Sequence, residues 1–240
     1  MITVRIPGAI YQTSGAIENG TFSGRWHFSF GSYHDRRFNH FGPLRVLNDD
    51  TLSPGAIWPL HPHKEIEVVT YCVEGEFRHA DEHGKGGILE RGGVQHTTVG
   101  TGMWHAEINN RDDIPMRFIQ MWFYPEKEGL PPSVEQMQFK KTARTDRLLP
   151  IVSHEGQGSL KLRADATVYS AFLTPGKTIT HSLPNGRGAY LYVLDGGTAE
   201  VNGHQVERLG ALMATDEEEL RITADGSELL LIDVALIKAG

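Results

Sequence analysis

Cysteine is nearly absent from this chain, since Cys72 is the only one among 240 residues. No disulfide can therefore form within the chain, which fits a reducing compartment such as the cytoplasm. No segment approaches the roughly 18 uninterrupted apolar residues that suggest a transmembrane helix, and residues 1–5 lack the apolar core of a secretory signal. We expect a cytoplasmic protein that has no membrane partner.

The chain also lacks an excess of basic residues. It has 23 Lys and Arg against 30 Asp and Glu, which gives a formal net charge of −7. Proteins bind nucleic acids and anionic membranes through basic patches, so this balance argues against direct contact with either partner. The densest basic cluster, residues 140–144, is short and is interpreted as a solvated connector.

Glycine and proline, in contrast, are plentiful, with 27 and 12 residues spread along the chain. They separate short β-prone runs, among them residues 66–73, 115–124 and 189–194. Many short strands joined by turns predict antiparallel sheets that form a sandwich or a barrel.

The chain divides into two β-rich halves around a stretch that is rich in proline and charge. Residues 189–197 repeat the pattern of residues 68–75, because each is an apolar run that ends in an acidic residue and glycine. This likeness indicates an internal duplication. We predict an all-β chain with two antiparallel β-barrel domains at residues 1–130 and 148–240, joined by a linker at residues 131–147.

Two short motifs in the first half indicate a metal site. His61 and His63 form one pair, and His105 and Glu107 form the other. Residues i and i+2 of a strand point to the same face, so two neighbouring strands would place three imidazoles and one carboxylate around one point. This set suits a divalent transition metal, and it accepts Fe, Mn, Co, Ni, Cu and Zn. The second half lacks such a pair and is expected to hold no metal.

Two further residues compete for a place in this site. His96 follows Gly93 at the same spacing at which His105 follows Gly102, so His96 could be the third imidazole. We prefer His105 because a carboxylate lies two residues after it. Glu67 shares the strand phase of His61 and His63 and could be a fifth ligand, although a supporting role is the preferred interpretation.

Other polar and aromatic residues have simpler interpretations. Residues 48–50, Asn-Asp-Asp, are interpreted as residues of a turn. His79 lies in a polar segment and is expected to be solvated. Trp58, Trp104 and Trp122 are expected in the core, and one of them could line a pocket for an aromatic ligand.

Several motifs of the chain resemble those of the cupins, and more specifically those of the pirin family. The spacing of glycine, histidine and glutamate over residues 55–75 is similar to the first cupin motif, with one extra residue before Gly75, and residues 102–109 resemble the end of the second. Four segments resemble pirin motifs in the pirin order: residues 27–30, 44–50, 61–64 and 100–107. Residues 148–234 resemble the C-terminal cupin of bacterial pirin-like quercetinases.

The resemblance implies a bicupin of jelly-roll domains with one metal, Fe(II) being favoured, held by His61, His63, His105 and Glu107. It implies a quercetin 2,3-dioxygenase that opens the ring of a flavonol with O2, in which Glu107 also serves as the catalytic base. Other pirins are regulatory binding partners, so the alternative is a non-enzymatic metal-binding protein that acts through protein contacts. An isomerase or sugar-binding cupin is a weaker third option.

Overall fold

A computed structural model describes residues 1–82 and 86–236 of the chain. Within these residues the secondary structure is almost entirely β, and the helices are three short 3-10 turns: η1 (Pro7–Ala9), η2 (Arg36–Phe38) and η3 (Lys141–Arg144). The described residues contain no helix that is long and apolar enough to cross a membrane.

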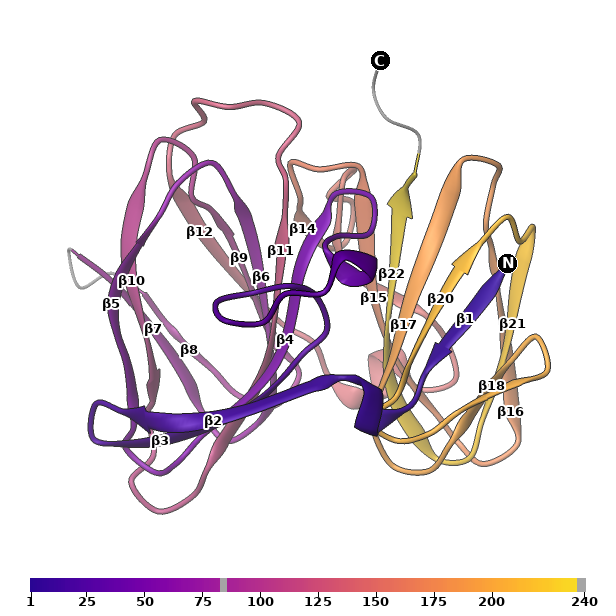
Figure 1. Ribbon diagram of the computed structural model, residues 1–240, viewed down its shortest axis with the longest axis horizontal. Helices are drawn as coiled ribbons and strands as arrows, with labels where there is room; N and C mark the ends of the chain where they lie inside the picture. The colour runs from indigo at the N-terminus through magenta and orange to yellow at the C-terminus, as the bar shows by residue number, and fades with distance from the viewer. Residues whose placement is uncertain (83–85, 237–240) are drawn as a thin grey trace.

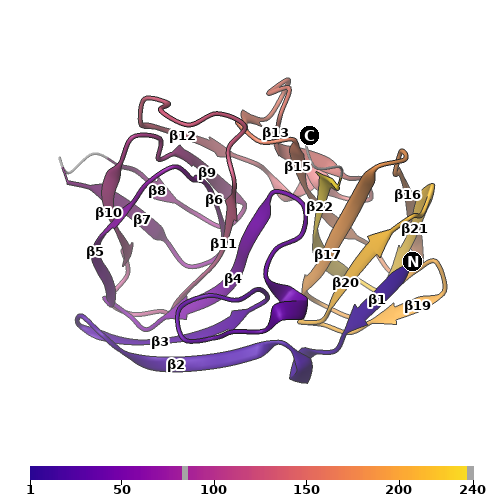
Figure 2. The ribbon, with the colours of Figure 1, turned by 45° about the horizontal axis from the view of Figure 1, so that its top comes forward.

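The first half is built from a seven-stranded and a four-stranded sheet. The large sheet has the order β12 (Ser133–Gln138), β9 (Gly93–Thr98), β6 (Glu67–Glu74), β11 (Met116–Phe123), β4 (Leu44–Leu52), β3 (Gly20–Trp26) and β2 (Tyr11–Ile17). The small sheet has the order β5 (Ile57–His63), β10 (Met103–Asn109), β7 (Phe77–Asp81) and β8 (Ile88–Leu89). In Figure 2 the small sheet forms the outer wall of this half.

The second half repeats this plan. Its large sheet has the order β1 (Ile2–Arg5), β20 (Ala211–Thr215), β17 (Arg187–Asp195), β22 (Ser227–Ala235), β15 (Ala166–Leu173), β13 (Leu149–Ser153) and β14 (Leu160–Lys161). Its small sheet has the order β16 (Lys177–Ser182), β21 (Glu219–Ala224), β18 (Ala199–Val201) and β19 (His204–Val206). Among the strands of the described residues, β13 with β14 is the one parallel pair, and the other pairs are antiparallel.

This architecture confirms the predicted all-β fold with two jelly-roll halves. The two sheets of each half face one another, and the ladders of the described strands do not join them into a closed barrel. Strands β6 and β17, which contain the repeated sequence pattern, occupy the same position in the two large sheets.

Two edge strands differ from the predicted domain limits. Strand β1 begins the chain but pairs with β20 of the second half, from Ile2 opposite Ala214 to Arg5 opposite Ala211. Strand β12 lies in the predicted linker but pairs with β9 of the first half. Each strand forms hydrogen bonds with backbone groups that would otherwise be unpaired at the edge of its large sheet. A local sequence pattern does not reveal which distant strand has such an edge. The side chains of β12 are mostly exposed, so it also lacks a strong apolar signal.

The two large sheets pack against each other, as the side-by-side halves in Figure 1 show. One apolar cluster includes Tyr71 and Phe123 of the first half and Tyr190 and Leu230 of the second, all of them fully buried. Buried polar contacts also cross this interface: the Tyr192 hydroxyl donates a 2.5 Å hydrogen bond to Asp49, and Tyr71 donates one of 2.6 Å to Glu228. The small sheets, as far as the chain is described, take no part in this interface, so each half has its own interior between its large and small sheets.

Candidate metal centre

Strands β5 and β10 bring the two predicted pairs together. His105 lies opposite His61 in the antiparallel register, and the register shifts before Glu107, which lies opposite Trp58. This bulge on β5 includes Pro59, a residue that cannot donate a ladder hydrogen bond and suits an irregularity. Leu60 and Pro62 are exposed, so His61 and His63 turn inward as the alternation of a strand requires.

The side chains of the four residues converge. Ligand nitrogens of His61, His63 and His105 all lie within 4.8 Å of one another, as expected of a group that could hold a metal ion. The Glu107 carboxylate lies beside them, with Oε1 3.6 Å from His105 Nε2 and Oε2 3.9 Å from His61 Nε2. Residues that the sequence separates by more than 40 positions therefore form one cluster.

The inward-facing atoms of this cluster are suited to a cation. His63 Nε2, His105 Nε2 and Glu107 Oε2 are buried and have no hydrogen-bond partner among the described residues. An unpartnered buried polar group costs about 1–3 kcal/mol, so such atoms seldom gather without a ligand. The opposite ring nitrogens of two of the imidazoles are occupied: His61 Nδ1 lies 2.8 Å from the Pro59 carbonyl oxygen and His105 Nδ1 lies 3.1 Å from His79. The donor set fits a divalent transition metal.

Two of the imidazoles are in the neutral form that binds metal. Burial, together with the neighbouring His105 and His61 rings, lowers the pKa of His63 to about 4. Burial also lowers the pKa of His105 to about 3, with contributions from His61 and His79. Both rings are therefore neutral at pH 7, and no proton has to leave before a metal binds.

Strand β11 holds the Glu107 carboxylate in place. Gln120 Nε2 donates a 2.7 Å hydrogen bond to Glu107 Oε1, and Trp122 Nε1 donates one of 2.9 Å to Gln120 Oε1. The Trp122 ring also packs edge-on against the His63 ring, at a centroid distance of 4.6 Å. Both ends of the Gln120 amide are thus engaged, and Glu107 keeps Oε2 free to face the imidazoles. No sequence motif indicated this role for Gln120.

The expectation that His79 is solvated is wrong. Its side chain lies inside the first half and is only 2% exposed, with Nε2 directed at His105 Nδ1. This contact fixes the ring orientation of His105, as partners of metal-binding histidines commonly do. The strand alternation could have revealed it, since His79 lies two residues after the buried Phe77 and shares its face.

Glu67 and His96 lie away from the cluster and bind each other. Their contact of 2.6 Å is fully buried on the large sheet, and the Arg163 backbone N–H of the second half donates to the same carboxylate at 3.2 Å. Glu65, with a φ of 51°, separates β5 from β6, so the strand phase of His61 does not continue to Glu67. The structure therefore brings His105, and not His96, to the other two imidazoles.

Residues 48–50 belong to strand β4 and are buried, so their interpretation as a turn is wrong. Asp49 faces the second half, and Arg117 of the neighbouring strand β11 donates to it in two hydrogen bonds of 2.7 and 2.8 Å. Asn48 and Asp50 face the interior of the first half. These polar residues can lie in a buried strand because each has polar surroundings. A local sequence pattern does not show those surroundings, since they come from other strands.

A small cavity of about 80 Å³ opens beside the cluster. His61, His63 and Glu107 contribute to its lining. The remainder of the wall is aromatic or polar: Phe30, Trp58, Phe118, Trp122, Asn48, Asp50 and Gln120. Sites for drug-sized ligands usually measure about 300–1,000 Å³, so this cavity accepts only part of such a molecule as it stands.

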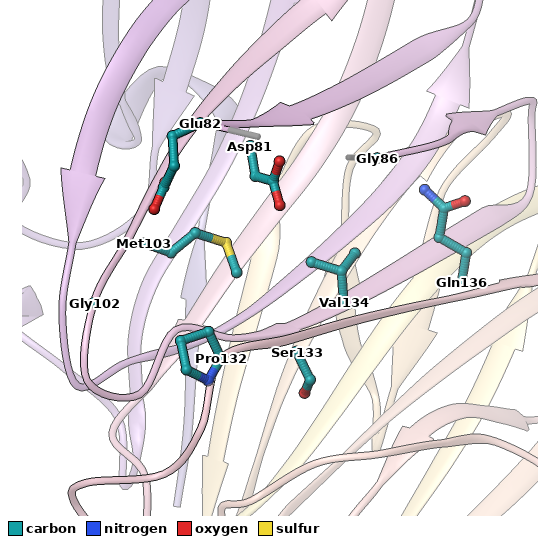
Figure 3. Close-up of a pocket in the computed structure, with 9 residues that line it drawn as sticks. All are labelled: Asp81, Glu82, Gly86, Gly102, Met103, Pro132, Ser133, Val134 and Gln136. Atoms are coloured by element: carbon teal, nitrogen blue, oxygen red, sulfur yellow. The ribbon is translucent and has the colours of Figure 1, made fainter. Parts of the chain in front are cut away.

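A larger cavity of about 550 Å³ lies on another side of the first half. Figure 3 shows Asp81 and Met103, from β7 and β10, on one side of it, and Val134 and Gln136 of β12 on the other. None of the four predicted metal ligands lines this cavity.

Comparison with known proteins identifies the family. The pirin family model matches residues 11–123, and the model of the quercetinase C-terminal cupin domain matches residues 150–234. A relative from Pseudomonas aeruginosa, named provisionally as a quercetin 2,3-dioxygenase, is 39% identical over 92% of this chain and 96% of its own length. The chain belongs to the pirin family. Another relative, named quercetin 2,3-dioxygenase, from Escherichia coli K12, is 34% identical over 87% of this chain and 90% of its own.

A solved pirin has the same fold. The bacterial pirin YhhW from Escherichia coli, in complex with nickel(II), superposes with a TM-score of 0.90 at 30% identity, covering 99% of this chain and 100% of that one. A metal ion is therefore present in a pirin that is similar to this protein along its whole length. The histidine cluster of the first half is the candidate for such a site here.

Proposed function

We propose that this protein is a metal-dependent dioxygenase that opens the ring of a flavonol such as quercetin with O2. One divalent metal, Fe(II) being favoured, would be held by His61, His63, His105 and Glu107. The observation that carries the proposal is the convergence of buried, unpartnered ligand atoms beside a cavity with aromatic walls. Two relatives whose names give quercetin 2,3-dioxygenase activity support this choice of substrate.

When bound, the metal would lower the pKa of a substrate hydroxyl and orient it. Glu107 would serve as a ligand and, when its carboxylate is not bound to the metal, as the base that accepts the proton of the flavonol 3-hydroxyl at Oε2, since Gln120 holds Oε1. General-base help of this kind contributes typically ~10²–10⁴-fold to the rate. Gln120 and Trp122 would keep the carboxylate aimed at the cavity while the proton moves.

The size of the cavity limits how a flavonol can bind. Only the edge that carries the oxygens fits the present space, so the rings must extend past the mouth or displace Phe30. Phe30 packs edge-on against Trp26 and Trp122, at centroid distances of 5.0 and 5.2 Å. Flat aromatic neighbours of this kind suit the faces of a flavonol.

The proposal is tested by elemental analysis of the purified protein, followed by oxygen uptake with quercetin. We expect one metal per chain and O2 consumption that rises with metal content. A fully metallated protein that consumes no O2 with quercetin would exclude the dioxygenase.

A second candidate function is a non-enzymatic metal-binding protein that regulates a protein partner. The cavity of about 80 Å³ favours it, because a whole flavonol does not fit in that space. In this case the metal would have a structural or sensing role, and O2 uptake would stay at the level of a chelated control. The same oxygen measurement therefore separates the two candidates.

A further inference from the structure

A continuous row of aromatic rings leads from the metal cluster to the surface of the first half. In order from the cluster, this aromatic row consists of Trp122, Phe30, Trp26, Tyr11 and Tyr33. Its first ring contacts the His63 ring at a centroid distance of 4.6 Å, and the following contacts measure 5.2, 5.0, 5.9 and 4.5 Å. All five distances lie within the roughly 4.5–7 Å of aromatic rings in direct contact.

The outer end of the row is a stacked pair of tyrosines at the surface. The rings of Tyr11 and Tyr33 are 7° from parallel, and both side chains are partly exposed. They line a surface cavity of about 360 Å³, whereas Trp26 behind them is only 6% exposed. A tyrosine is oxidised by loss of one electron together with its phenolic proton, and the exposed position gives this proton a path to water. The row therefore joins a buried cluster to rings at which an oxidation can end.

The two indoles within the row are able to carry a positive charge. Trp122 Nε1 donates to Gln120 Oε1 at 2.9 Å, and Trp26 Nε1 donates to Asp50 Oδ1 at 3.1 Å. An indole that has lost an electron is a charged and therefore stronger donor, so each acceptor oxygen stabilises the oxidised ring. Phe30 is not easily oxidised, but it fills the space between the indoles, and an electron has to cross the width of only one ring there.

Other rings at the metal cavity do not continue to a tyrosine. Trp58 and Phe118 also line this cavity. In the part of the chain that the structure describes, their ring contacts are with Phe22 and Phe77, and neither of these is easily oxidised. The aromatic row is therefore the path by which an oxidation that starts at the cluster can reach the surface.

We propose that the aromatic row carries an electron from the tyrosine pair to the metal centre when hydrogen peroxide, the two-electron reduction product of O2, reacts there without substrate. This inference rests on the metal centre of the proposed function and goes beyond the flavonol reaction. One tyrosine of the pair would lose one electron and its phenolic proton. The second electron would come from bound Fe(II), which is left as Fe(III). The peroxide takes both electrons, the phenolic proton and one proton from solvent and becomes two waters. The imidazole ligands would thereby be protected from oxidation.

The test is to mix Fe(II)-loaded protein with an equimolar amount of hydrogen peroxide, without quercetin, and to freeze it rapidly for electron paramagnetic resonance. The parent should show a tyrosyl radical, and peptide mass spectrometry should find oxidation at Tyr11 or Tyr33. Tyr11→Phe/Tyr33→Phe should lose this signal and shift the oxidation to Trp26, Trp122 and the ligand histidines. Trp26→Phe should also lose the signal, because the row is interrupted although both tyrosines are present. The iron content of the variants should stay at the parent value.

Tyr124→Phe is the matched control, because Tyr124 is an exposed tyrosine of the same half that is not part of the row. It should give the parent signal, and Zn(II)-loaded parent should give none, since zinc has no redox chemistry. A parent-like tyrosyl signal in Tyr11→Phe/Tyr33→Phe or in Trp26→Phe would overturn the proposal, as would its absence from the Fe(II)-loaded parent.

These outcomes are independent of the flavonol reaction, because quercetin is absent from the experiment. A protein that forms the tyrosyl radical through the row but consumes no O2 with quercetin would support the row and exclude the dioxygenase. A protein that binds no iron would overturn the metal centre and the row together.

Discussion

The two halves of this protein use the same order of strands for different interiors. In the first half, the outer strands β5 and β10 present three imidazoles and a carboxylate. In the second half, the strands at the same places are β16 and β21, where Ile179 lies opposite Ile222 and His181 opposite Leu220. The jelly roll therefore does not itself create a site, and the inward residues of two strands decide whether the interior is polar or apolar.

His181 makes the contrast sharper, because it is a histidine on the strand that matches β5. Its Nε2 lies 2.7 Å from Asp233 Oδ2, and Arg187 Nε donates to the other oxygen of this carboxylate at 2.5 Å. Leu220 and Ile222 are fully buried in the apolar cluster of this half. This inward histidine thus contacts a carboxylate that is already paired with Arg187, and not a second imidazole.

The largest effect is expected for the metal content of the first half. The double substitution His61→Ala/His63→Ala removes two of the four ligands and should abolish stoichiometric metal, as measured by elemental analysis. His181→Ala in the second half should leave the metal at one per chain. Unchanged metal in His61→Ala/His63→Ala would defeat the assignment of the site.

Glu107→Gln is expected to have the next largest effect. The amide cannot accept the substrate proton, so the rate of O2 uptake with quercetin should fall ~10²–10⁴-fold in protein that retains its metal. Comparable turnover by the metal-loaded variant would exclude Glu107 as the base.

Ile222→Ala tests the apolar interior of the second half. Loss of a fully buried side chain should lower the free energy of unfolding by about 2–5 kcal/mol, as measured by urea denaturation. The metal content should be unchanged, since the ligands belong to the other half. Loss of the metal in this variant would show that the two interiors are not independent.

The smallest effect concerns the support of His105. His79→Ala removes the 3.1 Å contact to His105 Nδ1 and should weaken metal affinity about 10–100-fold, as measured by competition with a chelator. His154→Ala, an exposed histidine of the second half, is the control and should have the affinity of the parent. Parent-like affinity in His79→Ala would mean that His105 needs no partner.

These differences explain how far the sequence could predict the molecule. The repeated pattern and the turn spacing were enough for two β-rich halves, and two pairs at strand spacing were enough to name the four residues that now lie together. His79, Asn48, Asp50 and Gln120 come from other strands, and their place depends on register and on partners far along the chain. The pairing of edge strand β1 with the second half is equally non-local, because its partner strand lies about 210 residues away in the chain.

The account is tested most directly by an anomalous-difference map from crystals grown with Fe(II). It predicts one peak per chain, within about 2.1 Å of the ring nitrogens of His61, His63 and His105 and in contact with Glu107. A strong peak in the second half, or none beside these four residues in protein that carries one metal per chain, would contradict it.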